Sequence, residues 1–240
     1  MLSKNVVKDI QSLALKKHRD ESGLFLAEGP KLVEELLDLI PGQIEQVYAT
    51  ASWGAGKNGV TVIDDHDIEK ISALNTPNQV VAVVRKMVVK LPDSDGITVY
   101  LDRIQDPGNL GTIIRIADWF GVNDIVCSTG CADVYNPKTV QSTMASIARV
   151  NIYNDSADNW LQSQSAPIYA ASLQGENLYT APKAEKGILL IGNESKGIRP
   201  EFLVQATRLI TIPRRGGAES LNAAVATGII LSHLLPNGNG

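Results

Sequence analysis

Hydrophobic residues follow two kinds of spacing over the first ninety positions of this 240-residue chain. Val6, Ile10 and Leu13 recur at three- and four-residue steps, which predicts a helix over residues 5–17. Residues 80–84 are continuously apolar, which predicts a strand buried on both faces. The pattern between them predicts further strands and helices in alternation: strands at 25–27, 44–50 and 60–63, and helices at 30–39 and 67–74. We therefore expect a small α/β domain over residues 1–90.

The composition changes at residues 91–96, where proline, glycine and small polar residues are typical of a linker. Beyond it, strand patterns occur at 97–102, 124–128, 150–153, 168–172, 187–192 and 209–212. Helix patterns occur between and after them, at 110–120, 137–148, 157–164, 200–206 and 220–235. This alternation predicts a second α/β domain over residues 97–235, with a mainly parallel sheet covered on both faces. Residues 236–240, rich in glycine and asparagine, predict a flexible tail.

Three polar, glycine-containing segments follow predicted strands of this second domain. They are Asn109-Leu110-Gly111 with Arg115 downstream, Gly192-Asn193-Glu194-Ser195-Lys196-Gly197, and Ile212-Pro213 leading into Ser220-Leu221-Asn222. Ligands of parallel sheets bind beyond the carboxyl ends of the strands. Glycine allows a close backbone approach, and polar side chains orient what is bound. The three segments therefore predict one shared site.

Simpler interpretations exist for parts of these segments. Asn109 and Ser220 each suit the N-cap of the helix that follows. The helix over 110–120 nevertheless has a second apolar face, with Ile116 and Trp119 beside Arg115. A helix with two apolar faces packs against two separate surfaces. The second surface could belong to another protomer, with Arg115 projecting into a shared site.

The glycine-rich segment 192–197 is neither a dinucleotide fingerprint nor a phosphate loop, because its glycines and lysine stand in the wrong order. A nucleotide-dependent oxidoreductase is therefore disfavoured, and titration of NAD(P)H fluorescence would test it.

In order and spacing, the three segments resemble the signature motifs of the SpoU/TrmH branch of the SPOUT superfamily, the RNA ribose 2′-O-methyltransferases. Residues 136–146 resemble the region after the second strand of that domain, with Gln141 where arginine is common and Ala145 where glycine is common. Residues 17–29 resemble the small substrate-binding domain, with a ribosomal-protein-like α/β fold, that is often attached to these enzymes.

The resemblance implies a homodimer whose cofactor-binding end forms a deep trefoil knot. It implies S-adenosylmethionine as the cofactor, held by five residues: Gly192, Asn193, Gly197, Ile212 and Leu221. It also implies five residues in the catalytic pocket: Asn109, Arg115, Glu194, Ser220 and Asn222. The reaction would move a methyl group to a ribose 2′-hydroxyl, a poor nucleophile that needs a base and tight positioning.

The family view makes Arg115 the proton acceptor. This role sits awkwardly with a guanidinium, which keeps its proton in proteins, so we expect Arg115 at least to position a substrate phosphate and to stabilise developing alkoxide charge.

The overall charge is not that of a typical RNA-binding protein. The net charge is −4 and the pI is about 5.4, so bulk electrostatics would not attract RNA. Residues 1–31, however, carry six cations against four acids, and Lys16, Lys17 and Arg19 belong to the densest basic run. These three are the expected RNA contacts, although a solvated helix face is the alternative. The attached N-terminal domain favours ribosomal RNA over transfer RNA.

Other classes of protein are disfavoured by the remaining composition. The longest apolar stretch, residues 221–235, contains polar residues and is shorter than the ~20 residues of a membrane-spanning helix. The N-terminus lacks the apolar core of a secretion signal, so we expect a cytoplasmic protein. Cys127 and Cys131 are the only cysteines and the three histidines are far apart, so we expect reduced thiols and no metal.

An RNA-binding adaptor of the same fold, without catalytic activity, stays as the alternative function. Calorimetry with S-adenosylmethionine would distinguish it from the enzyme.

Overall fold

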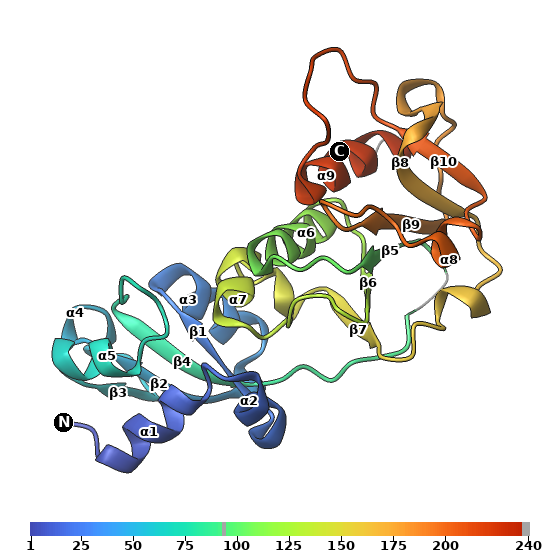
Figure 1. Cartoon of the computed structure of the whole chain (residues 1–240). Coiled ribbons are helices and arrows are strands. Elements are labelled where there is room, and N and C mark those ends of the chain that lie inside the picture. Colours follow the sequence, from blue (N-terminus) through green and yellow to red (C-terminus); the bar gives the residue numbers. More distant parts are fainter. Residues whose placement is uncertain (93–94, 237–240) are drawn as a thin grey trace. The chain divides into compact units, whose positions relative to one another are not determined.

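The computed structural model describes residues 1–92 and 95–236, and its contacts divide the chain into two compact units (Figure 1). The first unit contains Met1–Val88 together with Asp133–Ala148, and the second contains Val89–Ala132 and Arg149–Gly240. Residues 93–94 of the predicted linker and residues 237–240 of the predicted flexible tail lie outside the described residues.

The first unit is built on a mixed sheet whose described strands have the order β1-β4-β2-β3. The central strand β4 (Val80–Arg85) is antiparallel to both β1 (Leu24–Glu28) and β2 (Ile44–Ala49), and β3 (Val60–Val62) is parallel to β2. Residues 80–84 are buried, which confirms the prediction of a strand covered on both faces.

Helices cover this sheet, and they are α1 (Lys4–Ser12), α2 (Lys16–Ser22), α3 (Pro30–Leu39), α4 (Ala51–Gly54), α5 (Asp65–Ile71) and α7 (Pro137–Thr143). A short 3-10 turn, η1 (Pro41–Gln43), follows α3. Val81 and Val83 pack with Ile10 of α1 and Ile68 of α5 in one core cluster. On β1, the ring of Phe25 lies 4.9 Å from that of Tyr135, in the segment that precedes α7.

The prediction of one helix over residues 5–17 is wrong, because α1 ends at Ser12 and α2 begins at Lys16. The buried guanidinium of Arg19 donates hydrogen bonds to the carbonyls of Leu13 and Ala14, at 2.7 and 2.8 Å. A buried cation needs such acceptors, and these two carbonyls are available only where the helix is interrupted.

The second unit contains a parallel sheet, which confirms the predicted sheet type. Its described strands have the order β10-β8-β9-β5-β6-β7, and every neighbouring pair is parallel. They are β5 (Ile97–Asp102), β6 (Asp124–Ser128), β7 (Asn151–Asp155), β8 (Ile168–Asn177), β9 (Gly187–Gly192) and β10 (Arg208–Thr211). On one face, the ring of Tyr100 packs 6.1 Å from Trp160 and 5.2 Å from Phe202. The trefoil knot stays a prediction.

Helices of the second unit are α6 (Pro107–Trp119), α8 (Pro200–Leu203) and α9 (Ala223–Leu234), with 3-10 turns η3 (Leu161–Ser163) and η4 (Leu178–Thr180). Both predicted N-caps are wrong. Asp106 caps α6, since its side chain accepts the N–H of Asn109 at 2.8 Å. Asn222 caps α9, since its side chain accepts the N–H of Ala224 at 3.0 Å, whereas Ser220 precedes the helix.

Further helix predictions are wrong in length, and the helix expected over 200–206 ends at Leu203. The helix expected over 157–164 is reduced to η3, because buried Asp155 accepts the N–H groups of Asn159 and Trp160 in a turn. The helix expected over 137–148 ends at Thr143, and η2 (Ser146–Ala148) follows. Met144 and Ala145 separate the two with left-handed φ values of 48° and 70°. Left-handed backbone favours glycine, which is the residue that the family resemblance leads us to expect at Ala145.

Candidate active site

The second of the three motifs begins where β9 ends, at Gly192, whose strand partner is Asp102 of β5. A Cβ atom on Gly192 would lie 2.4 Å from the carbonyl carbon of Gly197 and 2.4 Å from the nitrogen of Ile198. Only glycine fits there. Gly197 has a φ of +66°, so glycine suits the second end of the loop as well.

Asn193 fixes this loop from within. Its backbone N–H donates to the carbonyl of Gly197 at 3.1 Å, and its own carbonyl accepts the N–H of Gly197 at 2.9 Å. The side-chain carbonyl of Asn193 accepts the N–H groups of Ser195 and Lys196, each at 3.0 Å. Its side-chain nitrogen donates to the carbonyl of Arg103 at 2.9 Å, which attaches the loop to the end of β5.

A chain of hydrogen bonds joins the three motifs. The side-chain nitrogen of Asn222 donates to the side-chain oxygen of Asn109 at 2.9 Å. The nitrogen of Asn109 donates to Oε1 of Glu194 at 2.6 Å. These residues come from the N-cap of α9, the first turn of α6 and the loop after β9, and they are 113 and 85 positions apart. The structure thus brings Asn109, Glu194 and Asn222 together.

Two charged residues that sequence reasoning missed, Asp102 and Arg199, fix the chain just after the loop over residues 192–197. Asp102 is fully buried, and its carboxylate accepts the backbone N–H of Arg199 at 2.7 Å and the Nε–H at 2.8 Å. A second nitrogen of Arg199 donates to Asp158 at 2.7 Å. Burial works to lower the pKa of Arg199, but the hydrogen bonds that Arg199 donates to Asp158 and Asp102 outweigh it and raise that pKa. An aspartate at a strand end, and an arginine two residues after Gly197, were the available signals.

The third motif begins directly after β10, at Ile212. Thr211 is the last residue of β10, and its hydroxyl is buried without a hydrogen-bond partner among the described residues. Ile212 follows, half-buried, and Leu221 is 46% exposed. An unpaired hydroxyl, apolar side chains and closely packed glycine backbone fit the adenosine part of S-adenosylmethionine, because such sites combine apolar walls with a few polar groups.

Two predicted catalytic residues are not hydrogen-bonded to this group. Arg115 is exposed on α6, and Ser220 is exposed in the segment before α9. In the described part of the chain, no hydrogen bond links either of them to Asn109, Glu194 or Asn222. One turn beyond Arg115, Trp119 is 84% exposed.

The three predicted RNA contacts divide into two groups. Lys16 and Lys17 are exposed on α2, where they pair with Asp20 at 2.7 Å and Glu21 at 3.9 Å. Arg19 is only 1% exposed, and it donates to Asp133 at 2.5 Å. Its guanidinium is inside the first unit and already paired, so it cannot contact a phosphate in this structure.

Residues 1–92 and 95–236 contain neither a membrane-spanning helix nor a cluster of metal-binding side chains. No helix there is long and apolar enough to cross a membrane. The same residues contain no group of three His, Cys, Asp or Glu side chains that could hold a metal ion. Both cysteines are free thiols, Cys127 buried and Cys131 partly buried.

A unit with a parallel sheet that has amide, carboxylate and glycine groups at its strand ends, in one chain with a small mixed α/β unit, is the architecture of a SPOUT methyltransferase with a substrate-binding domain. The chain belongs to the SpoU rRNA Methylase family, which matches residues 96–232. The MRM3-like substrate binding domain matches residues 4–82.

Relatives along the whole chain are consistent with this assignment. The 23S rRNA (guanosine(2553)-2′-O)-methyltransferase RlmP of Bacillus subtilis is 32% identical over 237 residues, 95% of each protein. A putative RNA methyltransferase of the TrmH family from Porphyromonas gingivalis has a TM-score of 0.87 at 38% identity, covering 98% of both chains. An AdoMet-bound rRNA methyltransferase from Sinorhizobium meliloti has a TM-score of 0.84 at 34% identity, covering 98% of this chain and 95% of the other.

Proposed function

We propose that this protein transfers a methyl group from S-adenosylmethionine to a ribose 2′-hydroxyl in RNA, with ribosomal RNA favoured over transfer RNA. The hydrogen-bonded chain Asn222–Asn109–Glu194 carries the proposal, because it unites three motifs distant in sequence at the ends of parallel strands. The family assignment and relatives named as rRNA 2′-O-methyltransferases support it.

S-adenosylmethionine supplies a methyl group activated by its sulfonium charge. The loop over Gly192, Asn193 and Gly197, together with Ile212 and Leu221, holds this cofactor. The close packing at Gly192 fixes the position of that loop, and the bonds of Asn193 fix its shape. Because the loop is already ordered before binding, little conformational entropy is lost when the ligand binds.

The remaining predicted residues act on the RNA. Asn109, Ser220 and Asn222 shape and orient the pocket, and Glu194 is held in place by the amide of Asn109. Arg115 positions a substrate phosphate and stabilises the alkoxide charge that develops on the 2′-oxygen.

The protein works as a homodimer in which Arg115 acts beside the partner's cofactor. Trp119 is 84% exposed on α6 and Val225 is 50% exposed on α9, and these apolar side chains form part of the dimer contact.

The first unit binds the RNA substrate. Lys16 and Lys17 contact its phosphates, because they are the exposed cations of the basic run and the net charge of −4 requires a local attraction. The same proposal includes the domain boundary at residues 91–96, the trefoil knot at the cofactor end and a cytoplasmic location.

Mapping of 2′-O-methyl groups in ribosomal RNA from cells that lack this protein tests the proposal. We expect one such mark to disappear and to return when the wild-type gene, but not an Asn109→Ala variant, is restored. Survival of every mark would exclude the enzyme. Calorimetry with S-adenosylmethionine addresses the adaptor alternative, which would show no binding.

A further inference from the structure

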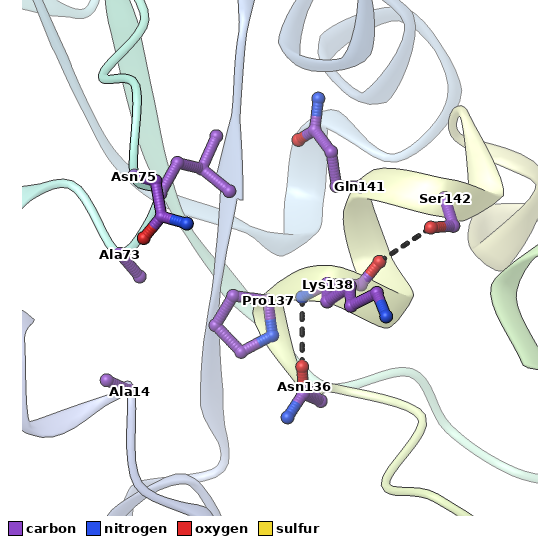
Figure 2. Close-up of a pocket in the computed structure, with 9 residues that line it drawn as sticks. Ala14, Ala73, Asn75, Asn136, Pro137, Lys138, Gln141 and Ser142 are labelled. Atoms are coloured by element: carbon purple, nitrogen blue, oxygen red, sulfur yellow. Dashed lines mark hydrogen bonds between the residues drawn. The ribbon is translucent and has the colours of Figure 1, made fainter. Parts of the chain in front are cut away.

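The first unit carries a groove of about 420 Å³ that the proposed methyl transfer leaves unassigned (Figure 2). Its walls come from the turn after α1, the segment after α5 and the helix α7. The side chains that matter here are Leu74, Asn75, Asn136, Pro137, Gln141 and Ser142. The volume is within the range of about 300–1,000 Å³ typical of small-ligand sites.

Arg19 fixes two walls of this groove. It is 1% exposed and donates to the carbonyl of Ala14, which lines the groove, at 2.8 Å. It also donates to Asp133 at 2.5 Å, and the carbonyl of Asp133 accepts the hydroxyl of Thr139 in α7 at 2.9 Å. The turn after α1 and the start of α7 are therefore held by one buried cation.

Glu28 fixes the remaining wall. This carboxylate of β1 is 3% exposed. It accepts the hydroxyl of Ser72 at 2.5 Å and the N–H of Ala73 at 2.8 Å, immediately before Leu74 and Asn75. Burying an ionisable group is costly unless it is paired or hydrogen-bonded, and the bonds that Arg19 and Glu28 make hold the walls of the groove in one shape without a ligand.

Primary amides face the groove from separate walls. Figure 2 shows Asn75 on one side, with Gln141 and Asn136 on the α7 side. Within the described residues, the amides of Asn75 and Gln141 make no hydrogen bond to protein, and Asn136 uses its oxygen to accept the N–H of Lys138 at 2.9 Å. Donor and acceptor groups are thus left for a ligand that has both.

Nucleobases have this combination. Asn and Gln amides pair with base edges, and sequence-specific RNA recognition targets unpaired bases that are splayed out and bonded along their edges. Pro137 and Leu74 add apolar walls suited to the ring. We propose that this groove binds one unpaired nucleotide of the RNA substrate and reads its base through Asn75 and Gln141. This inference rests on the proposed function, and it assigns the first unit a role in sequence selection.

Nuclear magnetic resonance of the side-chain amides tests the groove directly. The ¹⁵N-labelled full chain is titrated with AMP, CMP, GMP and UMP, and the signals of Asn75 and Gln141 are assigned from the single alanine variants. We expect both signals to shift with at least one nucleotide and to saturate at roughly millimolar concentration, since a lone nucleotide makes few contacts. If neither signal moves with any of the four, the groove is not a nucleotide site.

Kinetics with ribosomal RNA from cells that lack the protein provide the second test. The Asn75→Ala/Gln141→Ala variant should raise the KM for RNA by about tenfold or more, and leave the Kd for S-adenosylmethionine and the melting temperature unchanged. The control Gln43→Ala/Asn58→Ala removes two amides elsewhere in the same unit and should leave KM unchanged. An unchanged KM in the groove variant overturns the inference. A wild-type protein that transfers no methyl group overturns the proposed function, while the titration still decides the groove.

Discussion

Replacement of Gly192 by alanine should displace the loop that carries Glu194. The new Cβ would lie 2.4 Å from the backbone atoms of Gly197 and Ile198, where ordinary contacts are at 3.4 Å or more. The loop therefore has to move by about 1 Å. Because the amide of Asn109 donates to Glu194 at 2.6 Å, the same movement breaks that hydrogen bond.

The expected cost of this displacement is about 1–3 kcal/mol, the usual penalty for overpacking. For a protein of this size, each kcal/mol lowers the melting temperature by roughly 2–4 °C. Binding of S-adenosylmethionine should weaken by at least about tenfold, since the displaced backbone is part of the cofactor site.

Calorimetric titration with S-adenosylmethionine and thermal unfolding measure both effects. Gly96→Ala is the matched control, because a Cβ there meets nothing within 4 Å, and it should leave affinity and melting temperature unchanged. A Gly192→Ala protein with wild-type affinity and melting temperature would refute the close packing on which the site depends.

The remaining predictions concern four other positions. Asn109→Asp puts a second carboxylate beside Glu194, and kcat/KM for methyl transfer should fall by roughly ten- to a hundredfold; wild-type values would contradict the hydrogen-bonded chain. Arg115→Lys keeps the charge but loses the planar donor fork, so turnover should fall at least about tenfold, and near-normal turnover would exclude a bidentate role. Gly228→Ala brings a Cβ to 3.6 Å from Ile116, an ordinary contact, so helix propensity should stabilise α9 by about 0.5–1 kcal/mol in thermal unfolding; a lower melting temperature would show a closer contact. Burial raises the pKa of Glu28 above its ordinary 4.5, so the folded protein holds this proton more tightly than the unfolded chain. Stability should then fall as pH rises from 4.5 through the raised pKa, and urea unfolding of Glu28→Gln should lack that part of the slope; equal slopes would show that Glu28 does not titrate differently on folding.

Periodic patterns predicted most of the sheet structure. The alternation of apolar strands with helices predicted a parallel sheet, and the structure has one. Helix ends were harder, because several residues near each start can cap. Pro107 was the overlooked signal at the start of α6. Proline favours the first helical position, so the residue before it, Asp106, is a better N-cap than Asn109.

Long-range pairs explain what the pattern could not predict. Arg19 lies in a run of charged residues that is typical of an exposed helix face, yet it is buried and paired with Asp133. A local pattern could not predict this pair, because the two residues are 114 positions apart. The same pairing helps to place Asp133–Ala148 with the first unit, although the segment follows a strand of the second. Motif spacing indicated that Asn109, Glu194 and Asn222 share a site, but the direct bonds between them depend on how the strand ends meet.

Transfer of a labelled methyl group to RNA is the most direct test of the central claim. The purified protein is incubated with S-adenosylmethionine carrying a tritiated methyl group and with ribosomal RNA from cells that lack the protein, and the RNA is then hydrolysed in alkali. A 2′-O-methyl group blocks cleavage at its own nucleotide, so we expect the label in an alkali-resistant dinucleotide, and an initial rate of labelling roughly ten- to a hundredfold lower with the Asn109→Asp variant. Label found only in mononucleotides, or no transfer at all, would contradict ribose 2′-O-methylation by this site.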